Sequence, residues 1–190
     1  MRNGYAAQAV NRIASRRPTT VVAIPARNEA ATIEACLSAL GRQTERPDVV
    51  VVLINNSDDA THHNANRLRA QLPFALYLEP FQLPPERCNA GHARRQAMAL
   101  AADIAGPGGY LLTTDADGVV ASDWVERNVA NLWRGNDAVC GRALLDPRDA
   151  HLIPAHLHDD DRRECQLIDL LDRMAWVLDP ELHDPYPRHT

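Results

Sequence analysis

The segment that most restricts how this chain can fold is residues 48–54, with the sequence DVVVVLI. An aliphatic run this continuous is typical of a strand that is covered on both faces, as in parallel sheets. Further β-prone runs occupy residues 20–24, 74–79, 110–114 and 138–145, and Pro25 is expected to stop the first of them. Segments with helical spacing of apolar residues lie between them and after the last, at 30–43, 60–71, 88–104, 122–133 and 164–178, and Ser122 is expected to cap the fourth helix. This alternation predicts an α/β fold, a mostly parallel, Rossmann-like sheet with helices on both faces.

The length of 190 residues suits one domain with one sizeable core. We expect an N-terminal arm or short helix at residues 1–18, a single domain at 19–178 and a proline-rich tail at 179–190. In the last helix, the apolar residues at helical spacing predict a stripe that faces the core: Leu167, Leu170, Leu171, Met174 and Leu178.

Composition excludes several classes of function. The formal net charge is -5, which argues against general nucleic-acid binding, because that requires a basic face. All 20 basic residues are arginines, so mechanisms that need a lysine, such as a P-loop or a Schiff base, are excluded. The four cysteines are far apart, which favours reduced thiols in a cytoplasmic protein over a zinc site or disulfides. No apolar run is long enough to predict a membrane span, which leaves peripheral membrane contact open.

The predicted strand at residues 110–114 ends on two aspartates, Asp115 and Asp117. Side chains two positions apart in an extended segment point the same way. Two carboxylates at the carboxyl end of a parallel strand would meet at the crevice where such sheets bind ligands. Carboxylate oxygens suit Mg²⁺ or Mn²⁺, which often bridges to substrate phosphates. The alternative is an ordinary turn, because Asp and Gly are also common after strands.

Polar side chains also follow the first two strands, and two arginines follow the start of a helix. The strand ends carry groups that suit a nucleobase or a ribose, and the helix start suits an anion. Together with a cation, these features predict a site for a nucleoside diphosphate. The candidate residues beyond the aspartate pair are Pro25, Arg27, Glu29, Asn55, Asn56, Asp58, Arg94 and Arg95.

The same segments, in the same order, resemble a family-2 glycosyltransferase of the GT-A fold. The likeness rests on the runs VAIPARNE, INNSDDAT, NAGHARRQ, TDADG and SDWV, which lie at residues 22–29, 54–61, 89–96, 114–118 and 122–125. It implies transfer of a sugar from a UDP- or GDP-linked donor to an acceptor hydroxyl. It also implies that Asp117 coordinates Mg²⁺ or Mn²⁺, that Asp115 lies near the donor ribose and sugar, and that Arg95, with Arg94, holds the diphosphate.

The resemblance also places the catalytic base of inverting members in a later Glu-Asp motif. No such segment follows in this sequence, so the acceptor is unassigned and the catalytic base is expected to lie outside this chain. Two alternatives remain open. One is a haloacid-dehalogenase-like, Mg²⁺-dependent phosphatase, because residues 112–120 also resemble the first motif of that family. The other is a non-catalytic module that binds a nucleotide-sugar.

Overall fold

The computed structural model describes residues 18–144, 146 and 150–178. The chain divides into two compact units, the first ending at Asn136 and the second beginning at Asp137, and each is described by itself. Apart from Pro18, the predicted arm at 1–18 and the predicted tail at 179–190 lie outside the described residues.

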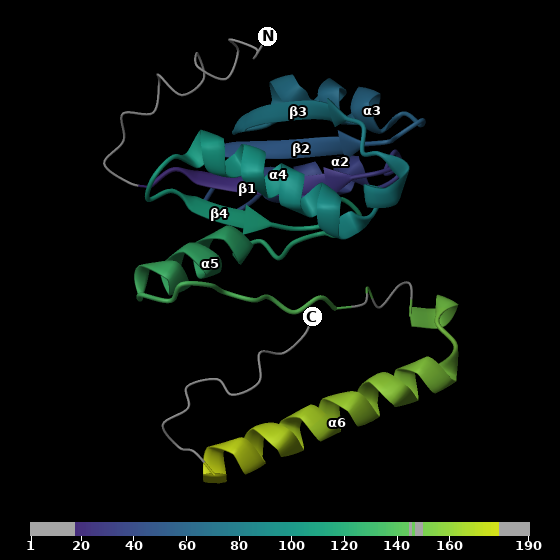
Figure 1. Cartoon of the computed structure of the whole chain (residues 1–190), viewed down its shortest axis with the longest axis vertical. Coiled ribbons are helices and arrows are strands. Elements are labelled where there is room, and N and C mark those ends of the chain that lie inside the picture. Colours follow the sequence, from purple (N-terminus) through teal and green to yellow (C-terminus); the bar gives the residue numbers. More distant parts are fainter. Residues whose placement is uncertain (1–17, 145, 147–149, 179–190) are drawn as a thin grey trace. The chain divides into compact units, whose positions relative to one another are not determined.

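The first unit alternates strands with helices, as the sequence predicts (Figure 1). Two short 3-10 turns also occur, one at Arg69–Gln71, directly after residue 68, and one at Pro85–Arg87, shortly before residue 90. The main elements are β1 (Thr20–Ala26), α2 (Ile33–Gly41), β2 (Val49–Asn55), α3 (Thr61–Leu68), β3 (Ala75–Phe81), α4 (Ala90–Ala105), β4 (Tyr110–Thr113) and α5 (Trp124–Trp133).

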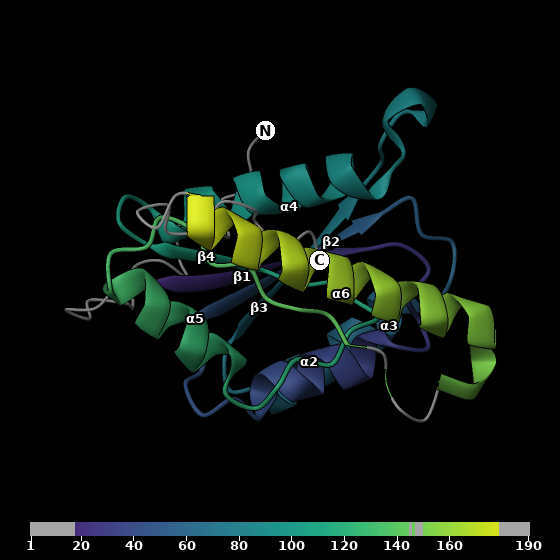
Figure 2. The same cartoon turned by 90° about the horizontal axis from the view of Figure 1, so that it is seen from below.

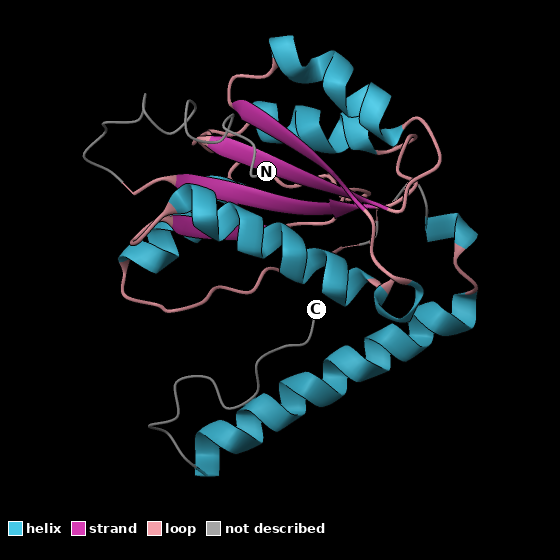
Figure 3. Ribbon diagram, turned by 45° about the horizontal axis from the view of Figure 1, so that its top comes forward, coloured by secondary structure: helices cyan, strands magenta, loops and turns pink. Residues whose placement is uncertain are grey.

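The strands form one sheet (Figure 3), whose order is β3-β2-β1-β4 (Figure 1), and all three pairings are parallel. Val22 of β1 lies opposite Val50 of β2 and Leu112 of β4, which sets the register. Parallel neighbours need a crossover connection, and here each crossover contains a helix. The predicted α/β class and its parallel sheet are therefore confirmed.

Both faces of the sheet are covered. Val22 and Val50 belong to a buried cluster that also holds residues of α2, α3 and α5. Their neighbours Val21 and Val51 face the other way and pack in a second cluster with α4. Figure 2 shows α4 on one side of the strands and α2, α3 and α5 on the other. Because alternate side chains of β1 and β2 enter different cores, both strands are apolar throughout, and each fully buried valine contributes about 1.5–3 kcal/mol.

The prediction that Pro25 stops the first strand is wrong, because β1 continues through Pro25 to Ala26. Ala23 and Pro25 direct their backbone groups toward β4, since residues two apart in a strand face the same way. However, β4 pairs only with residues 20–23 of β1. No strand therefore needs the N–H group that Pro25 lacks, and the strand continues on its pairing with β2 alone.

The second unit contains a 3-10 turn at Ala150–Leu152 and the helix α6 (Ala155–Leu178). A strand at 138–145 is not formed: the described residues 138–144 have no regular structure, since no neighbouring strand pairs with them. The predicted core stripe of the last helix is also wrong, because Leu167, Leu170 and Met174 are 55%, 54% and 51% exposed. The periodicity of a sequence predicts that a helix has one apolar face, but it does not predict whether another element covers that face. The side chain of Leu178 is not among those that the structure describes.

Searched across the described residues, no helix combines the length and apolar character required to cross a bilayer.

Candidate functional site

The candidate residues lie on loops at one edge of the sheet. Strands β1, β2 and β4 end at Ala26, Asn55 and Thr113, and the loops that follow them carry most of the side chains singled out from the sequence. Because the strands are parallel, these loops leave the same edge, where open α/β sheets bind their ligands.

The loop after β4 presents the two aspartates to solvent. Ala116 between them is only 2% exposed and belongs to the buried cluster that contains Cys36. Asp115 and Asp117 on either side of it are exposed. Burial of the middle residue therefore turns both carboxylates outward, and the backbone N–H of Thr114, which donates to the Ala23 carbonyl at 3.4 Å, attaches the start of the loop to β1.

Arg94 on α4 contacts the aspartate loop directly. Its guanidinium donates to the Thr113 hydroxyl at 3.1 Å and to the Asp115 carboxylate at 2.5 Å. The Thr113 hydroxyl in turn donates to the Ala23 carbonyl at 2.9 Å. Arg94 thus joins helix α4 to strand β4, a partnership that the sequence does not reveal because the two ends lie far apart in the chain. Arg95 is exposed, and it has no hydrogen-bond or ion-pair partner in the described part of the chain.

The loops after β1 and β2 are held to each other. Asn28 has a positive φ of 56°. Its backbone N–H donates to the Ser57 hydroxyl at 3.1 Å, and its side-chain oxygen accepts from the Asp58 N–H at 3.0 Å. The Glu29 N–H donates to the Thr61 hydroxyl at 2.8 Å. These bonds bring the two loops together while the side chain of Asp58 stays exposed.

Asp59 is a residue that the sequence analysis did not select. Its carboxylate accepts from the Ala30 N–H at 3.0 Å and from both the N–H and the hydroxyl of Thr61, at 2.9 and 2.5 Å. The hydrogen bond from the Thr61 hydroxyl is the main cause that lowers the pKa of Asp59. The spacing of Asp59 and Thr61 is typical of an Asx-type cap, and that signal could have identified it.

Several other candidates have their polar groups turned to structural partners. Asn56, with φ of 49°, accepts from the Leu83 N–H at 2.9 Å and donates to the Leu83 carbonyl at 3.0 Å. The Glu29 carboxylate accepts from the Thr32 hydroxyl at 2.6 Å. Asn55 is 4% exposed at the end of β2. Pro25 is half-buried and Arg27 is exposed. Asn56 therefore fastens the segment after β3 to this edge.

Cys36 on α2 lies beneath the acidic loops. Burial, together with the smaller effect of the charges of Asp117, Asp115 and Glu29, raises the pKa of its thiol to about 12. The thiol donates to the Asp115 carbonyl at 3.5 Å. The electrostatic influence of all three carboxylates on one thiol shows that the loops after β1 and β4 gather negative charge at the same place.

The residues at this edge fit a divalent cation that also binds substrate. No set of three His, Cys, Asp or Glu side chains among the described residues forms a complete metal site. The exposed Asp117 carboxylate has no hydrogen-bond or ion-pair partner among those residues. Mg²⁺ is commonly held by one or two carboxylates plus substrate phosphates and water. Two aspartates at a strand end therefore suit such an ion, which would complete its shell with oxygens of the ligand.

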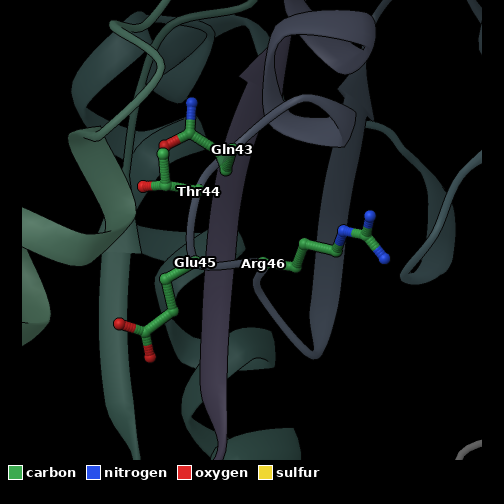
Figure 4. Close-up of a pocket in the computed structure, with 4 residues that line it drawn as sticks. All are labelled: Gln43, Thr44, Glu45 and Arg46. Carbon is green, nitrogen blue, oxygen red and sulfur yellow. The ribbon is translucent and has the colours of Figure 1, made fainter.

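A separate hollow lies at the other edge of the sheet. It has a volume of about 510 Å³ and is lined by Gln43, Thr44, Glu45 and Arg46, which connect the end of α2 to the start of β2 (Figure 4). Figure 4 shows the side chain of Arg46 pointing away from those of Gln43 and Thr44. This hollow contains none of the candidate residues and lies at the amino ends of the strands, so the ligand site is not assigned to it.

Comparisons with known proteins address the fold and the family of this chain. A search of curated proteins gave no match. Among solved structures, S. aureus TarS 1-349 in complex with UDP is 21% identical, with a TM-score of 0.50 over 66% of this chain and 38% of that one. The mannosyltransferase PcManGT from Pyrobaculum calidifontis, in complex with GDP-Man and Mn2+, is 28% identical, with a TM-score of 0.52 over 76% of this chain and 43% of that one.

This chain spans less than half the length of either solved relative. At 21% identity, the likeness to TarS is one of fold alone. PcManGT has the same α/β fold. The sequence model of glycosyl transferase family 2 matches residues 21–175, which is most of the chain. That match includes β1 from its second residue, the whole of β2, β3 and β4, and the paired aspartates, so the chain belongs to glycosyl transferase family 2.

Proposed function

We propose that the carboxyl edge of the sheet binds a nucleotide-diphosphate sugar and that the protein transfers the sugar to an acceptor hydroxyl. The observation that carries this proposal is the outward-facing pair Asp115 and Asp117, set on the buried Ala116 at a strand end within a family-2 domain. The donor would be UDP- or GDP-linked, since the TarS structure is a complex with UDP and the PcManGT structure is a complex with GDP-Man.

We assign the nucleoside to the loops after β1 and β2. Arg27, Glu29 and Asp58 would supply its polar contacts, and the hydrogen bonds between Asn28, Ser57 and Asp58 support those loops before a ligand arrives. Loops that are already ordered lose less conformational entropy on binding. The surface beneath the base would be formed by Pro25 and Asn55 at the strand ends and by Asn56, which is hydrogen-bonded to the backbone of Leu83.

We assign the diphosphate to Arg95 and to a divalent cation held by Asp117 with Asp115. Arg95 is exposed near the start of α4, where the helix dipole also favours an anion. A bound Mg²⁺ or Mn²⁺ would neutralise the negative charge that develops on the leaving diphosphate. The complex of PcManGT contains Mn2+ together with GDP-Man, which supports this choice of ion. Arg94 would orient Asp115, the residue it contacts, instead of holding phosphate.

All four cysteines are free, and this supports a reducing, cytoplasmic setting for the reaction. The acceptor and its catalytic base have no assigned residues within the candidate site.

Isothermal titration calorimetry with UDP and GDP, each with Mn²⁺ and with EDTA, tests the proposal. We expect one of the two diphosphates to bind, and Mn²⁺ to tighten its affinity at least about tenfold, because the ion bridges Asp117 to the phosphates. UMP and GMP serve as matched ligands that lack the diphosphate, so Mn²⁺ should leave their affinity almost unchanged. If Mn²⁺ affects neither diphosphate, and the protein instead hydrolyses a generic phosphomonoester with Mg²⁺, the phosphatase alternative replaces this proposal.

A further inference from the structure

The loop that carries the two aspartates runs along helix α2 on its way to α5 (Figure 2). Near its start, the Cys36 thiol of α2 donates to the Asp115 carbonyl at 3.5 Å. Near its end, the backbone N–H of Thr44, just beyond α2, donates to the Ser122 carbonyl at 2.9 Å. Helix α2 and the segment that directly follows it therefore contact this loop near both of its ends.

Gln43 makes the most extensive of these contacts. Its side chain is 4% exposed. Its amide nitrogen donates to the Ala121 carbonyl at 2.7 Å and to the Ala39 carbonyl at 3.3 Å, and its amide oxygen accepts from the Val125 N–H at 2.9 Å. All of these partners are backbone groups. Two of them, on Ala121 and Val125, belong to a segment that is far from Gln43 in the sequence. A buried amide with both ends satisfied fixes its partners in place.

Gln43 also replaces a missing cap on α5. The N-cap residue of this helix is Asp123, not the predicted Ser122, and its side chain makes no capping hydrogen bond. The Asp123 carboxylate pairs instead with Arg127, one turn further along, at 2.7 Å. The Val125 N–H, which would otherwise have no partner at the helix start, is taken by Gln43. The end of the aspartate loop and the first turn of α5 are therefore both attached to the segment that follows α2.

Two side chains contact this segment, Cys36 on α2 itself and Gln43 two residues beyond the end of α2 at Gly41. Cys36 supports the loop under the aspartates, and Gln43, just past the last residue of α2, holds it four residues beyond Asp117, at Ala121. Between these two contacts the buried Ala116 packs in the same cluster as Cys36 and Val125.

We propose that Gln43 is a positioning residue for the metal-binding loop. By holding Ala121 and Val125 against the segment that follows α2, it fixes the path of the loop from which Asp117 projects, and so sets where that carboxylate meets the cation. This inference rests on the proposed function of the same site. Metal ligands must be held within about 0.5 Å of their working geometry, and a loop anchored at one end only would not achieve this.

The test compares Gln43→Leu with the wild-type protein, and Gln71→Leu is the matched control. Gln71 is exposed, and it has no hydrogen-bond partner among the described residues, so its variant makes the same chemical change without touching the loop. UDP and GDP affinities are measured by calorimetry in Mn²⁺ and in EDTA, and their ratio gives the metal-dependent gain. Circular dichroism and the thermal midpoint establish that each variant is folded at the temperature used.

We expect Gln43→Leu to reduce the metal-dependent gain about tenfold or more, in line with losses seen when partners behind metal ligands are removed. The affinity in EDTA should stay within about twofold of wild type, because the β1 and β2 loops are untouched, and Gln71→Leu should match wild type in both conditions. If Gln43→Leu is unfolded, Gln43→Glu, which keeps the shape and the acceptor for Val125 but loses the amide donor, is measured instead against the same criteria.

An unchanged metal-dependent gain in the folded variant would overturn the inference. Equal losses in Mn²⁺ and in EDTA would overturn it as well, since they would mean that Gln43 only stabilises the fold. A wild-type protein without any metal-dependent gain would instead refute the proposed function, and the positioning role with it.

Discussion

The guanidinium of Arg94 holds the carboxylate of Asp115 at 2.5 Å, which links helix α4 to the first of the two aspartates after β4. The same arginine donates to the Thr113 hydroxyl, so it contacts both the end of the strand and the start of the loop. The second aspartate, Asp117, has no such partner in the described part of the chain. Arg94 therefore orients the Asp115 carboxylate, whereas the Asp117 carboxylate is free to bind a cation. This difference suits a site where Asp117 is the main metal ligand.

Replacing Arg94 tests this separation. Because the ion pair is partly exposed, Arg94→Met should cost about 1 kcal/mol of stability or less. We expect a larger effect on binding: the gain in UDP or GDP affinity from Mn²⁺ should fall several-fold, as Asp115 loses its orientation. Arg95→Met is the matched variant, and it should weaken nucleotide binding in Mn²⁺ and in EDTA alike, because Arg95 is assigned to the phosphates. Identical behaviour of the two variants in calorimetry would contradict the separation.

Removal of the candidate metal ligand has a simpler expected outcome. Asp117→Ala should abolish the effect of Mn²⁺ on nucleotide affinity while the thermal midpoint stays close to wild type, because Asp117 is exposed and makes no described hydrogen bond. Asp103→Ala, a change of the same kind on an exposed part of α4, should leave both quantities unaltered. An Asp117→Ala protein that still responds to Mn²⁺ would remove this residue from the metal site.

Asn56 should matter more for stability than its place in a loop suggests. Its side chain brackets the backbone of Leu83, which is 6% exposed. Asn56→Gly should cost about 1–3 kcal/mol, because it leaves buried backbone groups without partners. Asn56→Ala should cost roughly 1 kcal/mol more, since its φ of 49° is unfavourable for a residue with a Cβ. Urea unfolding of the three proteins measures this order, and an Asn56→Ala protein more stable than Asn56→Gly would refute it.

Asp59 should make the stability of the protein depend on pH, because its carboxylate joins the loops after β1 and β2. The Thr61 hydroxyl lowers the pKa of Asp59 below its usual 3.8, so the folded state favours the ionised carboxylate. The resulting stabilisation is present above pH 3.8 and is lost as the pH falls through the lower, folded-state pKa. Asp59→Ala should therefore lower the urea midpoint at neutral pH, and the difference from wild type should shrink in acid. Asp58→Ala, at the exposed neighbour, should show no such difference in stability.

The sequence was sufficient for the parts of the fold that depend on local pattern. The continuous aliphatic run of β2 predicts a strand buried on both faces, and Val50 and Val51 do enter opposite cores. The sequence also predicts that Asp115 and Asp117 follow a strand, and both are exposed on either side of the buried Ala116. The resemblance to family 2 is confirmed by the match over residues 21–175.

Predictions failed where a segment depends on a neighbour that the sequence does not specify. The run at 138–145 is β-prone, but its described part, residues 138–144, forms no strand. Pro25 does not end β1, because the missing N–H faces the side where β4 has already stopped. The stripe of α6 is apolar and correctly periodic, yet Leu167 and Met174 remain exposed.

The sequence by itself determined most of the segments that become strands and helices, and which chemical groups follow the strands, because these depend on side-chain period and on residue type. Only the tertiary structure decided how those groups are paired: Arg94 with Asp115, Asn56 with Leu83, and Gln43 with Ala121 and Val125. Each of these contacts joins residues more than twenty positions apart. Packing, which no local pattern encodes, brings such residues within hydrogen-bond distance.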